Sequence, residues 1–296
     1  MLIAFNRPEL TNRVIDEIRK AKPEKLYFAV DGPRLKNSRD IEKCDEVKNL
    51  IGRVDWQCDI KTLFSEKNLG CKLGPYSAMK WFFENVEEGI VLEDDVLPDV
   101  SFFYFCQDLL NYYREDNRVG TISGNNFHRD IEIEGSYCFS KYSQTWGWAT
   151  WRRVWEKYDI DIKSWPDLRN EKWLKSILKN PLARFYWTLI FDSVYSNKIN
   201  SAWDYQWTFM SFANNFLTII PKVNLASNIG IGNADATHTK QKNKLASIDS
   251  EEVSFPLTHP KFVSTNTILD QAIQRKTYVL WKEIGVRMAK YLGVRI

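Results

Sequence analysis

The chain has 296 residues, of which 44% are hydrophobic and 27% charged, an ordinary globular composition that excludes global disorder, collagen and coiled coil. Its 41 Lys and Arg residues against 38 Asp and Glu give a net charge of +3, too little for a protein that works mainly on nucleic-acid phosphates. The aromatic content is high, with 12 Trp, 13 Tyr and 17 Phe, which fits either ring stacking or a core of bulky side chains.

Five scattered cysteines without a Cys-x-x-Cys pair argue against a disulfide framework and a zinc site, and they favour a reducing compartment. The apolar run at the start of the chain is too short for a signal peptide, because Asn6-Arg7-Pro8 interrupts it. No stretch approaches the roughly 18 to 20 apolar residues of a transmembrane helix. We therefore expect a soluble cytoplasmic protein.

Apolar runs alternate with helical segments through the first half of the chain. The expected strands are Leu2–Phe5, Lys25–Val30, Cys58–Phe64, Gly89–Leu92 and Gly120–Ser123. Helices are expected between them, starting near Pro8, over Asn37–Ile51, after Asn68-Leu69-Gly70 and from Phe102 to Tyr113. This alternation predicts an α/β fold with a mostly parallel central sheet and helices on both faces.

The second half is less regular. Strands are expected at Tyr137–Tyr142 and Leu217–Val223, and helices at Trp146–Tyr158, Lys172–Leu178, Ala183–Tyr195, Asp204–Asn214 and Thr267–Leu292. Residues 228–239 are expected to form a loop because they carry several Gly and Asn residues, and residues 241–260 because they are polar.

The expected strand Gly89–Leu92 runs directly into three acids, Glu93-Asp94-Asp95. Ligands of open α/β sheets bind at the carboxyl ends of the strands, where these acids are expected to lie. Because adjacent carboxylates repel one another, a hard divalent cation such as Mg²⁺ or Mn²⁺, which commonly bridges to substrate phosphates, is their natural neutraliser. The alternative interpretation is an acidic loop that faces water.

Five short motifs occur in a fixed order along the chain. They are Phe5-Asn6-Arg7-Pro8, Val30-Asp31-Gly32-Pro33, Asn68-Leu69-Gly70, Val91-Leu92-Glu93-Asp94-Asp95 and Trp146-Gly147-Trp148-Ala149-Thr150-Trp151. Together, over roughly Leu2 to Thr239, they resemble bacterial GT-A-fold glycosyltransferases of the family-2-like kind. The sequence is also similar to the eukaryotic N-acetylglucosaminyltransferase I group, whose metal motif is likewise Glu-Asp-Asp. The resemblance implies a GT-A sheet and metal-assisted, inverting transfer of a sugar from a nucleotide-sugar donor, with a UDP-sugar favoured, to a glycan or glycolipid acceptor.

The resemblance also implies roles for individual residues at the donor. Arg7 would face the nucleotide or its phosphates, Asp31 would contact the base or ribose, and Asn68 is placed with them as a donor-binding residue. Glu93 and Asp94 would hold the ribose and the hydroxyls of the donor sugar. The alternative for Arg7 is a surface cation at a helix start, and the alternative for Asp31 is a turn former before Gly-Pro.

The resemblance implies that Asp95, the last acid of the motif, binds Mn²⁺ or Mg²⁺. A metal in this place takes up the charge that develops on the departing nucleoside diphosphate. The resemblance also implies that His238, in a Gly- and Asn-containing loop, contacts the metal or the diphosphate, and a neutral imidazole suits Mn²⁺ as a ligand. The alternative for His238 is an ordinary surface histidine.

An inverting transferase needs a base that removes the proton of the acceptor hydroxyl. Asp204 stands between Trp203 and Tyr205 at an expected helix start, and it matches the catalytic acid of the resembling family. A flanking Trp can desolvate the acid and raise its pKa. The structural alternative is that Asp204 caps the helix, while Trp203, Trp207 and Met210 supply core packing.

Four tryptophans lie within ten residues. Trp146 and Trp148 flank Gly147 and are expected either to stack against a sugar ring or to lie in the core. Trp151 and Trp155 are four residues apart and would share one helix face, which favours packing.

The predicted organisation is a GT-A domain over residues 1–265 and a C-terminal amphipathic helix over 266–296. Residues 1–125 would form the half that binds the nucleotide sugar, and 126–265 the acceptor-side half. From Thr267 onward six basic residues face two acids, so the helix is expected to contact an anionic membrane surface at its cytoplasmic face or, alternatively, to pack on the domain.

Two other functions stay open at this stage. A sugar nucleotidyltransferase also uses an α/β sheet with acidic metal ligands, but a Gly-rich basic loop would normally follow its first strand, where Asn6-Arg7-Pro8-Glu9 stands here. A catalytically inactive nucleotide-sugar-binding protein is the third interpretation.

Overall fold

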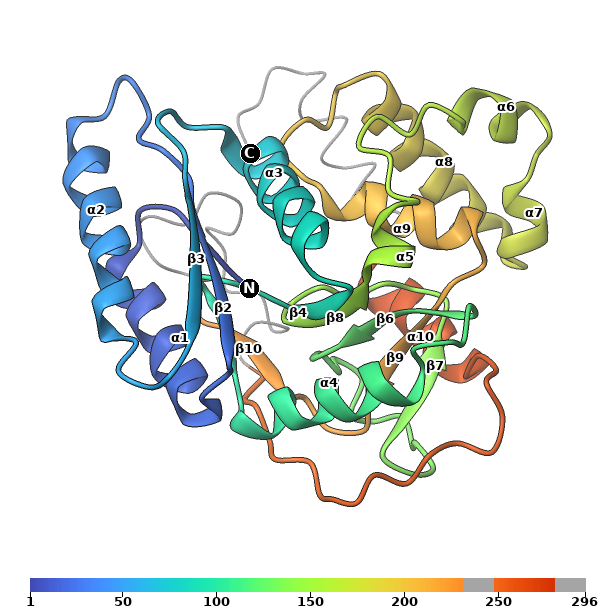
Figure 1. Ribbon diagram of the computed structural model, residues 1–296. Helices are drawn as coiled ribbons and strands as arrows, with labels where there is room; N and C mark the ends of the chain where they lie inside the picture. The colour runs from blue at the N-terminus through green and yellow to red at the C-terminus, as the bar shows by residue number, and fades with distance from the viewer. Residues whose placement is uncertain (231–247, 280–296) are drawn as a thin grey trace.

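The computed structural model describes residues 1–230 and 248–279. Its central sheet has eight strands in the spatial order β3-β2-β1-β4-β8-β6-β9-β7 (Figure 1). The bounds of these strands are β1 Leu2–Ala4, β2 Lys25–Val30, β3 Asp59–Phe64, β4 Glu88–Glu93, β6 Val119–Ser123, β7 Tyr137–Ser140, β8 Trp148–Trp151 and β9 Leu217–Pro221. Two further strands, β5 (Val96–Pro98) and β10 (Ala226–Asn228), pair antiparallel in a small separate sheet.

The N-terminal part of the sheet is parallel. β1 pairs parallel with β2 and with β4, β2 pairs parallel with β3, and β6 and β9 form another parallel pair. Every residue of β2 except Lys25 is buried, as expected for an apolar strand that is covered on both faces. The predicted α/β fold with a mostly parallel central sheet flanked by helices is therefore confirmed.

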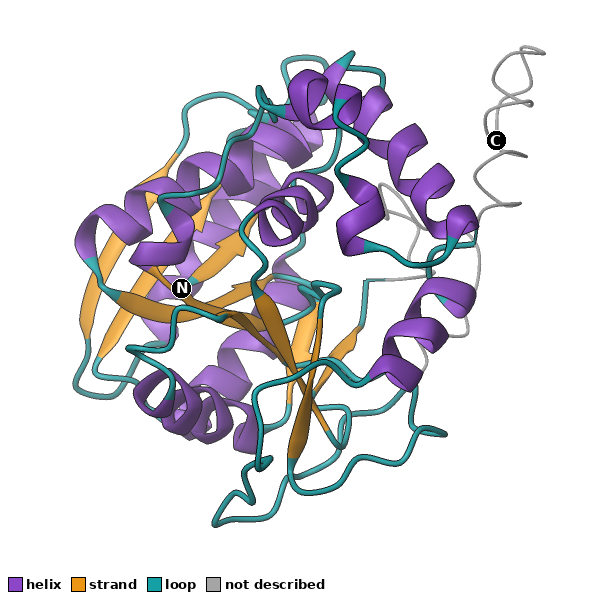
Figure 2. Cartoon of the chain, turned by 90° about the vertical axis from the view of Figure 1, so that its right-hand side faces the viewer, coloured by secondary structure: helices purple, strands orange, loops and turns teal. Residues whose placement is uncertain are grey.

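The helices form layers on the two faces of this sheet (Figures 1 and 2). Their bounds are α1 Pro8–Ala21, α2 Ser38–Asn49, α3 Gly70–Asn85, α4 Val100–Tyr112, α5 Arg152–Trp155, α6 Trp165–Asn170, α7 Leu174–Ile177, α8 Pro181–Tyr195, α9 Asp204–Ala213 and α10 Thr267–Lys276, with a 3₁₀ turn at Leu50–Arg53. Helix α1 contacts α2 and α4, whereas α3 contacts α5. Helix α1 starts with Pro8, whose fixed backbone angle suits the first turn, and buries Val14 and Ile18 against the sheet.

Strand β8 corrects one expectation. Residues Trp146–Tyr158 were expected to be helical, but Trp148–Trp151 forms a strand and only Arg152–Trp155 turns into helix α5. β8 lies antiparallel between β4 and β6, and all four of its residues are buried. Trp148–Trp151 is a strand because its backbone N–H and C=O groups pair with β4 and β6, whereas in a helix they would pair within the segment.

A second core lies beyond the sheet, under α8, α9 and α10. Its members are large apolar side chains, among them Trp165, Trp187, Ile190, Phe191, Phe209, Phe212, Leu269 and Ile273. It joins the C-terminal part of the described chain to the helices of the second half. None of the helices within the described residues is long and apolar enough to cross a membrane.

The C-terminal helix is shorter than expected. A single helix over Thr267–Leu292 is predicted by its apolar spacing, but α10 ends at Lys276. Leu269 and Ile273 are fully buried in the second core, so α10 packs on the domain, as in the second of the two expectations for the tail. Residues 280–296, which carry the rest of the predicted membrane-facing helix, lie outside the described residues.

Candidate functional site

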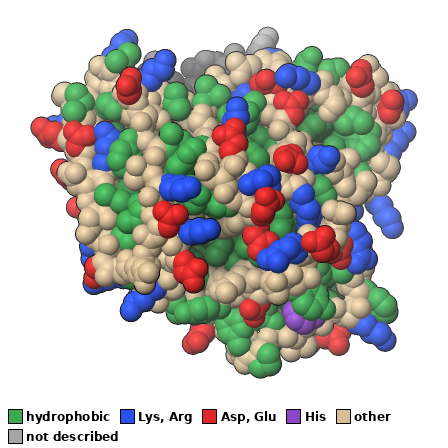
Figure 3. Space-filling view, viewed as in Figure 1, with side chains coloured by type: hydrophobic (Ala, Val, Ile, Leu, Met, Phe, Trp, Pro, Cys, Tyr) green, Lys and Arg blue, Asp and Glu red, His purple; other side chains and the backbone are tan. Residues whose placement is uncertain are grey.

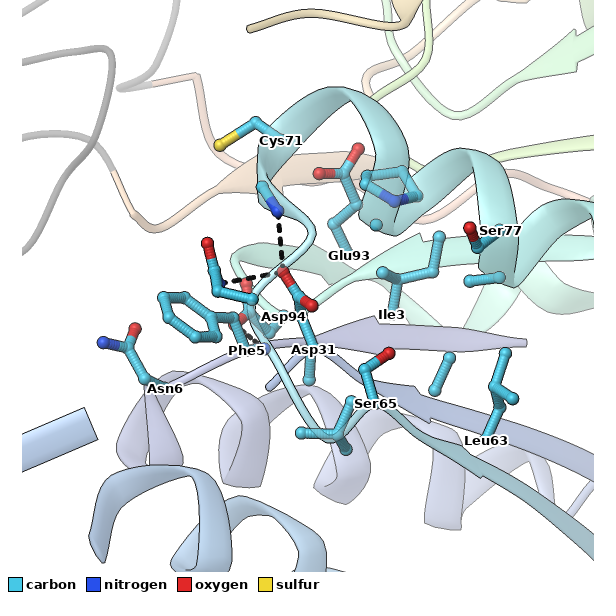
Figure 4. A pocket seen from close by; sticks show the side chains of 18 of the residues that line it. Ile3, Phe5, Asn6, Asp31, Leu63, Ser65, Cys71, Ser77, Glu93 and Asp94 are labelled. Atoms are coloured by element: carbon cyan, nitrogen blue, oxygen red, sulfur yellow. Dashed lines mark hydrogen bonds between the residues drawn. The ribbon is translucent and has the colours of Figure 1, made fainter. Parts of the chain in front are cut away.

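A cavity of about 490 Å³ opens at the edge of the sheet where β1, β2 and β4 end (Figure 4). Because these strands are parallel, the residues that follow each of them meet at one place. The cavity is lined by side chains from these strand ends and from the start of α3, including Phe5, Asn6, Arg7, Asp31, Arg34, Asn68, Cys71, Glu93 and Asp94. All five predicted donor-binding residues thus line one cavity: Arg7, Asp31, Asn68, Glu93 and Asp94.

Arg7 forms the electrostatic centre of this site. Its Nε donates to Asp94 Oδ2 at 3.3 Å, its Nη2 donates to Asp94 Oδ1, and its Nη1 donates to Asp95 Oδ2 at 3.0 Å. Burial alone would lower the pKa of Arg7, but the charges and hydrogen bonds of the two carboxylates outweigh it and raise that pKa. Arg7 is therefore a permanent cation that bridges two acids, not a surface residue at a helix start.

Asp94 is the most deeply buried of the three acids, with 3% of its surface exposed. Besides Arg7, it accepts a hydrogen bond from the backbone N–H of Phe5 at 3.2 Å, which joins the end of β1 to the end of β4. A carboxylate that is buried this far and held by a guanidinium and a backbone amide is a fixed part of the cavity wall. The three acids therefore do not form an acidic loop that faces water.

Glu93 lines the same cavity as Arg7 and Asp94. Burial raises its pKa, and the charges of Asp95 and Asp94 raise it further, while Arg7 opposes them. The charge of Asp204 also contributes to this shift, so the predicted base lies within electrostatic range of the acidic motif. Three carboxyl groups around one guanidinium thus hold the pKa of Glu93 at about 8, above its ordinary value.

Asp95 is held from two sides. Its backbone oxygen accepts a hydrogen bond from Ile229 N–H at 2.8 Å, and its side chain pairs with Arg7. A methyl group at Gly230 would stand 2.5 Å from Asp95 Oδ2 and 3.0 Å from Arg7 Nη1, so only glycine fits against this pair. The antiparallel pairing of β5 with β10 brings Gly230 to the acidic motif.

Asp31 and Asn68 organise the opposite wall, at the start of α3. Asp31 Oδ1 accepts the N–H groups of Gly32 and Leu69, both at 2.9 Å, and Oδ2 accepts the N–H of Gly70 at 3.1 Å and Asn68 Nδ2 at 2.9 Å. The carboxylate thus serves the unpaired backbone donors where α3 begins. Burial raises the pKa of Asp31 in spite of these bonds. A contact of either residue with a nucleotide base or ribose stays a prediction.

A buried acid that sequence reasoning did not single out supports the rim of the cavity. Asp40, with 1% of its surface exposed, accepts hydrogen bonds from Asn6 Nδ2 at 2.8 Å and from Arg34 Nε at 2.5 Å and Nη2 at 2.9 Å. The Arg34 guanidinium also lies 5.3 Å from the centre of the Phe5 ring. Asp40 therefore orients two residues that line the cavity, and no local sequence signal marks it because it sits in a polar helix.

Asp204 is the first residue of α9 and is exposed. One of its oxygens accepts the N–H of Tyr205 at 3.0 Å, which agrees with a helix-start position. Trp203 points away from it into the core, where its ring stacks on Trp148 at 5.6 Å between centroids. The expected desolvation of Asp204 by a flanking Trp stays a prediction.

The tryptophans near Asp204 form a packed layer under α9. Trp148 lies 4.7 Å from Trp207, and Trp155 stacks on Tyr158 at 4.9 Å. Trp148 has 1% of its surface exposed, so its ring belongs to the core and is not offered to a sugar. Trp146 is half-buried beside Phe127, and it is the member of the predicted stacking pair that keeps exposed surface.

The residues around Asp95 can be tested for their fit to a divalent cation. Within the described residues, no three His, Cys, Asp or Glu side chains converge as a closed metal cage. The donor set nevertheless suits Mg²⁺ or Mn²⁺, which are commonly bound by one or two carboxylates while substrate phosphates and water complete the shell. A bound divalent cation would also relieve the repulsion among the carboxylates of Glu93, Asp94 and Asp95. His238, the other predicted ligand, lies outside the described residues.

No family model matches the sequence, and no curated protein matches it either. Similar solved structures are transferases of two kinds. A mannosyltransferase from Pyrobaculum calidifontis, solved in complex with GDP-Man and Mn²⁺, has a TM-score of 0.36 at 11% identity over 53% of this chain and 45% of its own. S. aureus TarS residues 1–349 give a TM-score of 0.36 at 11% identity over 54% and 48%.

The second kind is represented by a cytidylyltransferase from Leptospira borgpetersenii, with a TM-score of 0.35 at 13% identity over 53% of this chain and 62% of its own. This chain therefore spans about half the length of the mannosyltransferase and TarS structures. The function proposed below rests on the residues of the site itself.

Proposed function

We propose that this protein is a glycosyltransferase, which moves a sugar from a nucleoside-diphosphate sugar to a hydroxyl of an acceptor. The observation that carries the proposal is that Arg7 and Asp94 line the cavity where β1 and β4 end, and that Arg7 also binds Asp95 beside it. A diphosphate needs permanent positive charge, and Arg7 supplies it from a fixed position. The carboxylates of Glu93 and Asp94 are acceptors for the hydroxyls of a ribose or a sugar.

In this proposal Asp204 is the base of a single displacement. The acceptor oxygen attacks the anomeric carbon on the face opposite the diphosphate, and its proton moves to the Asp204 carboxylate. The bond between the anomeric carbon and the diphosphate oxygen breaks with its electron pair, so a nucleoside diphosphate leaves and the configuration inverts. The exposed position of Asp204 leaves room for an acceptor hydroxyl beside it.

Arg7 and the acids around it would act on the leaving group. Arg7 faces the developing negative charge with a guanidinium that is already oriented by two carboxylates. A Mn²⁺ or Mg²⁺ ion on Asp95 would supply further charge neutralisation at the diphosphate. Asp31 and Asn68 would hold the start of α3 against the nucleotide, and His238 would be a further metal ligand.

The identities of the substrates are proposed more broadly. A UDP-sugar is the favoured donor, on the resemblance to the N-acetylglucosaminyltransferase I group, and a surface glycan or glycolipid intermediate is the proposed acceptor. Acidic and basic side chains are interspersed over the face drawn in Figure 3, and no nucleic-acid partner is part of the proposal. A cytoplasmic place at the inner face of a membrane, with contact through residues 266–296, completes the proposal.

The first assay incubates the protein with UDP-, GDP- or dTDP-sugars and Mn²⁺ and measures release of the nucleoside diphosphate. A parallel assay supplies sugar phosphates and nucleoside triphosphates and measures release of pyrophosphate. Diphosphate release that EDTA and Asp95→Ala both abolish is the expected result. Asp108→Ala, at an exposed position on α4, is the matched control and should keep full activity. Pyrophosphate release would make the protein a nucleotidyltransferase, and donor binding without turnover would make it a binding protein.

A further inference from the structure

The central sheet ends in two edge strands, β3 and β7, and only one of these edges is covered by another part of the described chain. At the edge of β7, Asn266 N–H donates to Phe139 O at 2.7 Å, and Phe139 forms a β-bridge with Thr265. β3 pairs with β2 alone, and no strand among residues 1–230 and 248–279 pairs with its other side. β3 is therefore the open edge of the sheet.

The backbone hydrogen bonds show which residues of β3 face this open edge. The N–H of Asp59 donates to Glu24 O at 2.8 Å, on the side of β2. Successive residues of a strand direct their N–H and C=O groups alternately to its two sides. The register with β2 has no shift, so the alternation holds along the whole strand. The N–H and C=O groups of Ile60, Thr62 and Phe64 therefore point to the open edge.

The features that usually prevent pairing at a free edge are largely missing from β3. The strand is six residues long, contains no proline and has no bulge. Its two charged residues, Asp59 and Lys61, are of opposite sign. The Lys61 ammonium lies 5.5 Å from the centre of the Tyr27 ring on β2, so it is directed away from the edge. Two copies of this edge can thus approach without net electrostatic repulsion.

The side chains of the edge residues match those of a second copy of the same strand. Ile60, Thr62 and Phe64 are alternate residues and share one face of the sheet. Ile60 and Phe64 keep 37% and 40% of their surface exposed. An antiparallel pairing about a two-fold axis at Thr62 places Ile60 opposite Phe64 of the second copy, twice, and Thr62 opposite its own equivalent. Pairs of a β-branched with an aromatic residue, and of two threonines, are favourable between antiparallel strands.

We propose that two copies of this protein pair through β3, antiparallel about Thr62, and form one continuous sheet. The outward N–H and C=O groups of Ile60, Thr62 and Phe64 all gain partners in this register. The two copies run in opposite directions, so their cavities at the ends of β1, β2 and β4 lie at opposite ends of the joined sheet and stay open. One strand pair is smaller than a standard interface of about 1,600 Å², so the dimer is weak and reversible. This pairing does not depend on the proposed transferase activity.

Sedimentation velocity of the full chain over a concentration series tests the proposal, and it should show a monomer that converts to a dimer as the concentration rises. Thr62→Pro removes the central outward N–H without removing a hydrogen bond to β2. It should weaken dimerisation at least tenfold and keep the native fold, which circular dichroism and thermal unfolding check. Thr62→Val keeps the β-branched shape and is the matched control, which should dimerise as the native protein does.

Charge substitutions test the register, because pairing about Thr62 places this residue opposite its own equivalent. Thr62→Lys and Thr62→Asp should each be monomeric, since like charges directly opposite repel. An equimolar mixture of the two variants should form a dimer at least tenfold more tightly than either alone. A native sedimentation coefficient that does not change with concentration would overturn the proposal. A dimer that persists in both Thr62→Pro and Thr62→Lys, or a mixture that stays monomeric, would overturn it as well.

Discussion

Arg7 donates to both oxygens of Asp94, although the two residues are 87 positions apart in the chain. The contact exists because β1 and β4 are neighbours in a parallel sheet and end at the same edge. The same guanidinium reaches Asp95, so one side chain holds the acidic motif in place. The stability of this edge and its capacity for an anionic ligand therefore depend on the same residue.

Arg7→Ala should lower the free energy of unfolding by about 3 kcal/mol, because it leaves two largely buried carboxylates without their cation. Mn²⁺ should recover part of this loss in the variant, since the ion supplies the missing charge. Urea denaturation with and without Mn²⁺ measures both effects. Arg19→Ala, which breaks an exposed pair with Asp55, should cost less than about 1 kcal/mol. Equal losses in the two variants would contradict the assignment of Arg7.

Asp204→Asn should lower kcat by about 10² to 10⁴ with donor binding retained, because the amide cannot accept the acceptor proton but can still serve the helix start. Initial rates and a donor titration separate the two quantities. Asp167→Asn, an exposed acid in the first turn of α6, is the matched control. An unchanged rate would leave Asp204 as a helix cap, and retention at the anomeric carbon would contradict a single displacement.

Gly230→Ala should disturb the contact between Asp95 and Arg7, since the added methyl group would stand 2.5 Å from Asp95 Oδ2. We expect the apparent affinity for Mn²⁺ and donor together to fall at least tenfold. A thermal-shift titration measures it. Gly52→Ala, where a methyl group meets nothing within 4 Å, should bind as the native protein does. Native affinity in Gly230→Ala would show that this contact is not needed.

The lowered pKa of Asp40 predicts how the stability of the protein changes at acid pH. The hydrogen bonds of Arg34 lower the pKa of Asp40 below its ordinary value, so its contribution to folding is complete above the unfolded pKa of about 4. That contribution is lost as the pH falls through the lower pKa of the folded state. Asp40→Asn should therefore destabilise the protein by about 1–3 kcal/mol at pH 7 and by less at pH 3.

Chemical denaturation at several pH values measures this difference. The control is Asp45→Asn, which removes an exposed acid paired with Lys48 on the same helix. It should change the stability little at any pH. A loss in Asp40→Asn that does not depend on pH would mean that packing, not charge, is what Asp40 contributes.

Sequence patterns predict those features of the fold that are determined by residues adjacent in the chain. Lys25–Val30 is an apolar run bounded by polar residues, and it is strand β2 over the same bounds. The acids after β4 were expected at a strand end because the preceding run is apolar, and the structure places them there. In both cases the information lies within a few adjacent residues.

The remaining features depend on contacts between distant segments. Trp148–Trp151 becomes a strand because β4 and β6 flank it, and its own composition does not distinguish a strand from a buried helix. The roles of Asp40 and Gly230 also arise from partners far along the chain, Asn6 in one case and Asp95 in the other. No pattern in the flanking residues points to such partners.

The position of β8 has a consequence for how the chain folds during synthesis. β4 and β6 leave the ribosome before Trp148–Trp151, and until that segment emerges each of them has a free edge where β8 will pair. Unpaired apolar strand edges invite pairing with other chains. A fragment that stops at residue 125 would keep these edges permanently, so we expect it to aggregate, and the two halves of the domain to become stable only together.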